Sequence, residues 1–264
     1  MCAKKSDNLK RLSPEEWEAS WQIHWKKAQL DYELPVDQSE EHQFLSEKRT
    51  VEKEKERLER ITKEFEMGFT ELSQLGPAVT IFGSARFKPG EPFYELSRET
   101  GNAFAKAGFT VLTGGGPGAM EAANKGAKEA GGPTYGLNII LPKEQDPNPY
   151  VNESFEFKYF FIRKVMLVKY SCAFIVMPGG LGTLDELFEA ATLIQCKKIG
   201  PFPLILVGGK FWKGLRDFVA YMADQGVFSP EEIGFSRIVE TPEEAIEMVL
   251  SSLPADFKKS LQPL

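Results

Sequence analysis

The segment CAFIVMPGGLGTLDELFEAATLIQ, residues 172–195, joins an apolar run to a helical pattern through a glycine-rich turn. Residues 172–177 have the length and apolar content of a buried strand, and residues 183–196 have the pattern of a helix. The turn between them contains Gly179, Gly180 and Gly182. This segment therefore predicts a strand that enters a helix through a turn in which backbone groups are accessible.

The same alternation of short apolar runs and helical stretches extends from Gly76 to the end of the chain. It predicts right-handed βαβ units and a parallel sheet covered on both faces. We expect an α/β protein with a Rossmann-like, doubly wound, mainly parallel sheet in residues 76–264. The expected strands are 78–83, 110–115, 134–140, 155–160, 172–177, 203–208 and 237–240, and the expected helices are 93–107, 117–130, 161–170, 183–196, 211–224 and 242–251.

Residues 1–75 have a different pattern and predict a helical N-terminal extension. Ser13 and Glu16 form a capping signature, and three tryptophans follow at every fourth residue, which places Trp17, Trp21 and Trp25 on one helix face. We expect this face to dock on the main domain or a neighbouring subunit; stacking on nucleic-acid bases is disfavoured by the acidic surroundings. A second helix is expected over 38–75, as a short coiled coil or an arm on a partner, without a chemical role.

Three expected strands end in loops rich in glycine and small polar residues: FGSAR (82–86), TGGGPGAM (113–120) and MPGGLGT (177–183). In a parallel sheet, ligands bind beyond the carboxyl ends of the strands, and a helix N-terminus behind such a loop favours phosphate. A single loop of this kind is also explained by a tight turn without a ligand. Three of them predict a phosphate or nucleotide site.

Known phosphate motifs fit these loops poorly. The chain has no G-x-x-x-x-G-K-[ST] sequence, which excludes a P-loop NTPase. GGGPGA resembles a dinucleotide fingerprint only loosely, because no acidic residue closes the next strand to bind a ribose.

Glu186 and Arg163 are the candidate catalytic residues. Thr183 and Glu186 also match a T-x-x-E capping box, so a purely structural helix start is an alternative for this pair. In the functional alternative, Glu186 faces the pocket and a cation from the Arg163-Lys164 pair tunes its acidity. A salt-bridged or solvated Arg163 remains the structural alternative.

Composition excludes several function classes. The 264 residues contain 42% apolar and 27% charged residues and carry a net charge of −6, which disfavours nucleic acid as a main partner. Only His24 and His42 occur, so the main domain cannot build a histidine-based triad or metal site. The three cysteines lack the spacing of a disulfide framework, which predicts a cytoplasmic protein. The sequence also has no apolar run of about 20 residues and no signal-peptide pattern, so we expect no membrane partner.

The segments GSAR, TGGGPGAMEAANKGA and FFIRKVMLVKYSCAFIVMPGGLGTLDELFEAATLIQ together resemble the LONELY GUY (LOG) family. The family signature P-G-G-x-G-T-x-x-E corresponds to residues 178–186, and the resemblance covers roughly residues 76–250. The N-terminal 75 residues lie outside it and suggest one of the longer bacterial-type members. The older family name, lysine decarboxylase, does not fit, because no lysine lies in a glycine-lined setting suited to a pyridoxal Schiff base.

The resemblance implies a phosphoribohydrolase that cleaves AMP or N6-prenylated AMP into the free base and ribose 5-phosphate. It implies catalytic roles for Arg163 and Glu186, a phosphate site in the PGGLGT loop, no cofactor or metal, and a homodimer or higher homo-oligomer with the helix after the motif at the interface. The expected substrate-binding residues are Gly83, Ser84, Thr113, Gly114, Gly115, Gly116, Met120, Lys164, Pro178, Gly179, Gly180, Gly182 and Thr183.

Elementary chemistry is compatible with this activity. N-glycoside hydrolysis passes through an oxocarbenium-like transition state. A carboxylate either stabilises its positive charge or orients the attacking water. Two alternatives remain: a non-catalytic nucleotide-binding or sensor module, and a dinucleotide oxidoreductase, which the missing ribose acid disfavours.

Overall fold

The computed structural model describes residues 13–30, 50–140, 146–200, 202–234 and 236–264. The chain forms two compact units, residues 1–48 and 49–264. In the first unit, helix α1 (Pro14–Leu30) begins with the expected capping box, in which Ser13 N donates to Glu16 Oε2 at 2.7 Å and Glu16 N donates to Ser13 Oγ at 3.2 Å. Trp17, Trp21 and Trp25 are exposed along α1. The part of the second expected helix before residue 50 lies outside the described residues.

The second unit is built on a parallel sheet of seven strands among the described residues, in the order β4-β3-β2-β1-β5-β6-β7. The expected strands are confirmed with shifts of one to three residues at their ends. Their bounds are β1 (Ala78–Phe82), β2 (Thr110–Thr113), β3 (Thr134–Ile139), β4 (Glu153–Phe157), β5 (Ala173–Val176), β6 (Leu204–Val207) and β7 (Ser236–Val239).

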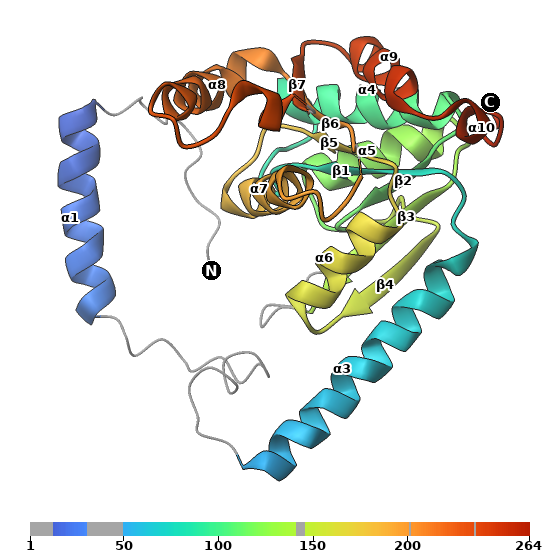
Figure 1. Ribbon diagram of the computed structural model, residues 1–264, viewed down its shortest axis with the longest axis horizontal. Helices are drawn as coiled ribbons and strands as arrows, with labels where there is room; N and C mark the ends of the chain where they lie inside the picture. Colours follow the sequence, from blue (N-terminus) through green and yellow to red (C-terminus); the bar gives the residue numbers. More distant parts are fainter. Residues whose placement is uncertain (1–12, 31–49, 141–145, 201, 235) are drawn as a thin grey trace. The chain divides into compact units, whose positions relative to one another are not determined.

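Helices cover both faces of the sheet, as a doubly wound fold requires (Figure 1). One face packs against α4 (Pro92–Lys106), α5 (Ala119–Glu129) and α9 (Pro242–Ser252). The other packs against α6 (Phe160–Lys169), α7 (Leu181–Gln195) and Trp212 of α8 (Gly209–Asp224). The short elements η1 (Leu72–Gln74), η2 (Pro230–Ile233) and α10 (Ala255–Lys258) complete the described part of this unit.

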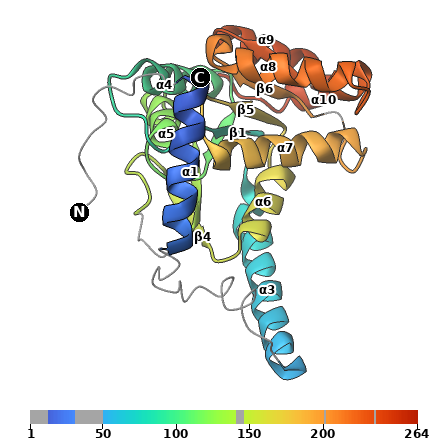
Figure 2. The ribbon, with the colours of Figure 1, turned by 90° about the vertical axis from the view of Figure 1, so that its left-hand side faces the viewer.

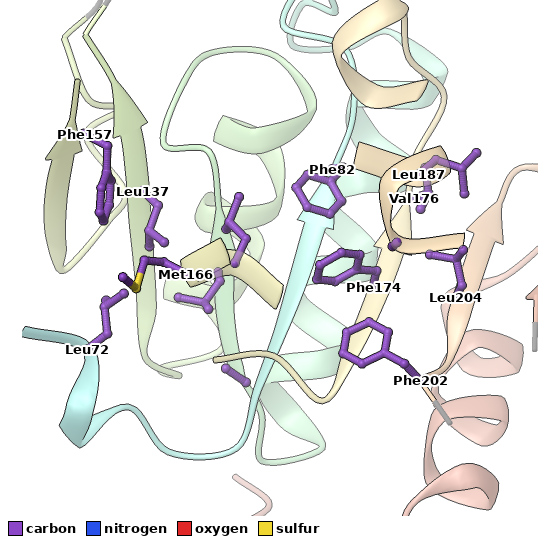
Figure 3. Packing of buried hydrophobic residues seen from close by; sticks show 14 of the residues in the cluster. Leu72, Phe82, Leu137, Phe157, Met166, Phe174, Val176, Leu187, Phe202 and Leu204 are labelled. Atoms are coloured by element: carbon purple, nitrogen blue, oxygen red, sulfur yellow. The ribbon is translucent and has the colours of Figure 1, made fainter. Parts of the chain in front are cut away.

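The core on the α6–α7 face is built from alternate strand residues, because successive side chains of a strand point to opposite faces. Phe174 of β5 lies between Phe82 and Phe202, with ring centroids 4.8 and 4.7 Å away and edge-to-face geometry at both contacts (Figure 3). This aromatic cluster packs on β1 and β5 and extends from Phe82, at the C-terminal end of β1, to Phe202, just before β6 (Figure 3).

Helix α3 (Val51–Glu71) belongs to the second unit, although the sequence pattern grouped it with the N-terminal extension. Its C-terminal half packs against α6, and both views show the two helices side by side there (Figures 1 and 2). Val51, Leu58, Phe65 and Leu72 recur every seven residues in this segment. Phe65 and Leu72 pack on the main core, whereas Val51 and Leu58 are exposed. Within the second unit, this row of apolar residues thus makes an intramolecular contact along half its length.

The strand order reverses between β1 and β5. Strands 1 to 4 extend the sheet in one direction from this point, and strands 5 to 7 extend it in the other. Loops that leave two such strands diverge to opposite faces and open a crevice between them. In the described part of the chain, no helix has the length and apolar character needed to cross a membrane.

Candidate active site

A cavity of about 750 Å³ lies at the carboxyl ends of the central strands. The three glycine-rich loops contribute its walls, as the sequence predicts. Backbone hydrogen bonds hold these loops together: Ser84 N donates to Pro178 O at 3.1 Å, and Ala119 N donates to Ser84 O at 2.9 Å. Expected substrate-binding residues that line it are Gly83, Ser84, Gly114, Gly116, Met120, Gly179, Gly180, Gly182 and Thr183, together with Arg163 and Glu186.

Helix α7 begins earlier than the T-x-x-E pattern suggests. Gly180 is the N-cap, and no side chain caps the helix start. Thr183 is therefore the third helical residue and not the cap, so the capping-box interpretation of this pair is wrong. The first N–H groups of a helix have no partner inside the helix, and here the residues of the first turn line the cavity. The start of α7 is thus a site that an anion can cap.

Gly180 and Gly182 are open on the cavity side. A Cβ at either position would meet no heavy atom within 4 Å, and Gly180 has a φ of −97°, which any residue adopts. Neither crowding nor backbone strain inside the protein requires glycine at these positions. Because glycine costs helix stability, its presence at Gly182 fits close approach of a ligand to the backbone.

Arg163 of α6 and Glu186 of α7 lie together at the wall of this cavity. Arg163 Nη1 is 3.6 Å from Glu186 Oε1, and both side chains are largely buried, with 8% and 12% exposed. Arg163 Nε donates to Leu137 O of β3 at 2.6 Å, which fixes the guanidinium against the sheet. Gly114 leaves room for it, since a Cβ there would collide with Arg163 Nη2. The solvated alternative for Arg163 is thus wrong, whereas the salt-bridged alternative agrees with its contact to Glu186.

Burial perturbs both charged groups. It raises the pKa of Glu186, and the nearby Arg163 opposes this rise. Burial also lowers the pKa of Arg163, against the attraction of Glu186. A carboxylate of raised pKa paired with a buried guanidinium in a cleft is typical of catalytic sites.

Four expected contact residues support the site from outside its lining. Thr113 Oγ1 donates to Asn124 Oδ1 at 2.7 Å and accepts from Gly115 N at 2.9 Å, so both turn inward. Lys164 pairs with Asp185 and Glu189 across the α6–α7 contact, at 3.2 and 2.8 Å. These pairs exist because consecutive helix residues face different directions, so Arg163 and Lys164 cannot both face the cavity. Pro178 contributes its carbonyl to the loop contact with Ser84.

Other residues of the lining were not expected from the sequence. Arg86 extends from the loop after β1, is exposed, and has no ion pair within the described ranges. Its place in the quoted FGSAR segment was a usable signal. The remaining ones are mostly apolar, and no local pattern marks them: Phe82, Ala85, Phe87, Asn138, Ile139, Phe160, Leu181 and Phe211.

The fold and this cavity define a Rossmann-like protein in which a helix start without a side-chain cap lies beside a buried acid–guanidinium pair. Comparison with known proteins agrees with this class. The sequence model of a family described as "Possible lysine decarboxylase" matches residues 120–249. The cytokinin riboside 5′-monophosphate phosphoribohydrolase of Mycobacterium tuberculosis is 34% identical over 160 residues, which cover 58% of this chain and 82% of that protein. The chain belongs to the LOG family.

Two further similarities bear on function. A pyrimidine/purine nucleotide 5′-monophosphate nucleosidase of Escherichia coli is 27% identical over 175 residues, which cover 61% of this chain and 38% of that protein. The solved structure of a molybdenum cofactor binding protein from Rippkaea orientalis superposes with a TM-score of 0.50 and 26% identity, over 67% of this chain and 98% of that chain. Proteins of this fold are thus named both as hydrolases and as binding proteins.

Proposed function

We propose that this protein hydrolyses the N-glycosidic bond of nucleoside 5′-monophosphates, AMP or N6-prenylated AMP, and releases the free base and ribose 5-phosphate. The observation that carries the proposal is the buried Arg163–Glu186 pair one helical turn beyond the uncapped start of α7. The relatives named as phosphoribohydrolase and nucleotide nucleosidase support it.

The 5′-phosphate binds at the start of α7. The first-turn N–H groups donate to it, and Gly180 and Gly182 let it approach the backbone. Arg86, on the neighbouring loop, supplies a countercharge. Phosphate binding energy then holds the ribose in place for the reaction.

Glu186 acts on the ribose. It lies three residues after Thr183, about 4.5 Å along the helix axis, so a nucleotide whose phosphate caps α7 places its sugar beside this carboxylate. There the ionised carboxylate stabilises the positive charge that develops on the sugar, or orients the attacking water. Arg163 holds Glu186 ionised and orients it, since removal of the guanidinium would raise the pKa of Glu186 further.

The base occupies the apolar side of the cavity, where Met120, Ile139 and Phe160 line the wall. Apolar and aromatic walls accept a flat purine and an apolar substituent on it. A comparison of kcat/KM for AMP and isopentenyladenosine monophosphate distinguishes the two substrates.

The alternative is a non-catalytic nucleotide-binding or sensor module. The specific observation in its favour is the similarity to a solved structure named as a binding protein. Such a module needs the glycine loops but not a buried acid–guanidinium pair, which carries a desolvation cost. Incubation with AMP separates the two functions: release of adenine and ribose 5-phosphate supports the hydrolase, and bound but intact AMP supports the sensor.

The same proposal includes a cytoplasmic homodimer or higher homo-oligomer. An apolar groove of about 770 Å³ runs between α7 and α8, and Leu187, Phe188 and Val219 are among its lining residues. Exposed apolar surface of this kind is typical of subunit interfaces. Light scattering on the full chain measures the mass in solution, and a monomer at micromolar concentration would contradict this part of the proposal.

A further inference from the structure

The C-terminal half of helix α3 contacts α6, and α6 carries Arg163. At the middle of α6, Gly68 allows close packing, since a Cβ there would lie 2.8 Å from Met166 Cε. At the end of α6, Tyr170 Oη donates to Phe69 O at 3.3 Å. The orientation of α6 is therefore set by α3 as well as by the sheet.

The start of α6 has no cap from its own sequence. Its N-cap is Tyr159, and no side chain of the segment accepts a hydrogen bond from the first turn. Unpaired N–H groups at a buried helix start are costly. Glu64 of α3 supplies an acceptor at the N-cap: its Oε1 accepts from Tyr159 N at 3.1 Å and from Lys158 N, the residue before the cap, at 3.0 Å. Glu64 is buried, and its carboxylate lies at the positive end of the α6 dipole.

Two hydrogen bonds connect this cap to the catalytic pair. Tyr159 N is bound by Glu64, and Tyr159 O accepts from Arg163 N at 3.2 Å. The backbone of Arg163 is thus one helical turn away from the carboxylate of Glu64. Arg57 of α3 adds a second contact at the same place, with its guanidinium carbon 5.5 Å from the centroid of the Tyr159 ring. A shift of Tyr159 would move Arg163 relative to Leu137 O and Glu186.

We propose that Glu64 is a positioning residue for the hydrolytic reaction, which caps α6 from outside and thereby places Arg163 against Glu186. This inference rests on the proposed function. It gives α3 a role in catalysis, although the sequence pattern of this helix predicts no chemistry. Glu64 also lies outside residues 120–249, which the family sequence model matches. Because misplacement by about 1 Å lowers rates on the order of a hundredfold in known enzymes, a lost cap is expected to affect turnover.

The test compares Glu64→Ala and Glu64→Gln in the full chain, with AMP as substrate. Glu64→Ala removes the acceptor, whereas Glu64→Gln keeps an amide oxygen in the same place. We expect Glu64→Ala to lower kcat by about tenfold or more with KM changed less than about threefold, because Arg163 is misplaced while the phosphate site is intact. We expect Glu64→Gln to retain kcat within about threefold of the unsubstituted chain.

Two control variants separate positioning from stability. Glu66→Ala removes an exposed carboxylate two residues away on the same helix, and Val249→Ala opens a cavity in the core on the opposite face of the sheet. Both are expected to keep kcat, although Val249→Ala lowers the melting temperature. A wild-type kcat in folded Glu64→Ala would overturn the proposal. So would a decrease in kcat that is no larger in Glu64→Ala than in Val249→Ala of equal stability.

Hydrogen exchange at the amides of Lys158 and Tyr159 provides a readout that does not depend on turnover. We expect Glu64→Ala to lose protection at these amides and Glu66→Ala to retain it. Unchanged protection in Glu64→Ala would overturn the capping role. Failure of the unsubstituted chain to release adenine from AMP would instead overturn the proposed function, so the two failures are distinguishable.

Discussion

The loops before α5 and α7 are both rich in glycine, but glycine is present in them for different physical reasons. In the loop before α5, Gly115 and Gly118 have φ angles of +72° and +73°, and a Cβ at either would collide with protein atoms. Asn148 Nδ2 also donates to the carbonyls of Gly115 and Gly116, at 3.1 and 3.2 Å. The loop before α7 has neither feature at Gly180, where the space is open.

This difference teaches how to distinguish glycines that serve the fold from glycines that serve a ligand. A fold glycine is recognised by a positive φ or by a neighbour in the place of its Cβ. A ligand glycine has neither and borders a cavity. By this criterion, Gly115 and Gly118 serve the fold, whereas Gly180 and Gly182 are candidate ligand glycines, so substitutions at the two kinds of position should affect different measurements.

The largest effect is expected on the α7 side, from Glu186→Gln. The amide keeps the shape but cannot stabilise positive charge on the ribose, so kcat should fall by about a thousandfold, or roughly 4 kcal/mol. The dissociation constant for AMP should change little, because the phosphate site is intact. Adenine release followed by chromatography gives kcat, and calorimetry gives binding. A Gln variant with normal turnover would reduce Glu186 to a structural residue.

Next is Gly180→Val, which tests the ligand glycine directly. We expect the unsubstituted chain to prefer AMP over adenosine in kcat/KM by about a hundredfold, roughly 2.7 kcal/mol, because only AMP carries the phosphate. The valine side chain projects into the open space and should remove most of that preference. Unfolding stability should fall by less than about 1 kcal/mol, since no protein atom is displaced. Equal turnover of adenosine and AMP by the unsubstituted chain would contradict the phosphate site.

Gly118→Ala is the matched test of a fold glycine. The new Cβ would meet the backbone of Ser84 and Ala85, and the alanine would have to adopt a positive φ. The free energy of unfolding should therefore fall by about 2 kcal/mol. Urea titration measures this change. Full stability in this variant would show that the α5 loop is not constrained as the structure indicates, and would remove the contrast between the two loops.

The smallest effect concerns the pH dependence of turnover. Burial raises the pKa of Glu186 above its ordinary value of 4.5, and Arg163 moderates the rise. Catalysis needs the ionised carboxylate, so kcat/KM should decrease as the pH falls through a midpoint above 4.5, by about tenfold per pH unit below it. Rate measurements across the acidic range locate this midpoint. A midpoint at or below 4.5 would mean that Glu186 is solvated in the working enzyme.

Local patterns predicted the elements of the main unit well. Apolar runs placed β1, β2, β5 and β6 because a strand buried on both faces has a continuous apolar sequence. The edge strands β4 and β7 were also placed, although they are partly exposed. The strand before α6 was the least accurate, expected at 155–160 and found at Glu153–Phe157. Of its last expected residues, Phe160 begins α6, and Glu64, from a distant part of the sequence, accepts the N–H groups of Lys158 and Tyr159 just before it. No local pattern contains that information.

The sequence by itself determined the alternation of strands and helices, the three glycine-rich loops, the lack of histidine in residues 43–264, and the candidate pair Arg163 and Glu186. These follow from residue types and spacings that act within a few residues of each other. Only the tertiary structure decided that Thr183 is not a cap, that Lys164 faces Asp185 and Glu189, and that α3 supports α6. Each of these depends on which helix face meets which neighbour, and that is set by packing between elements far apart in the sequence.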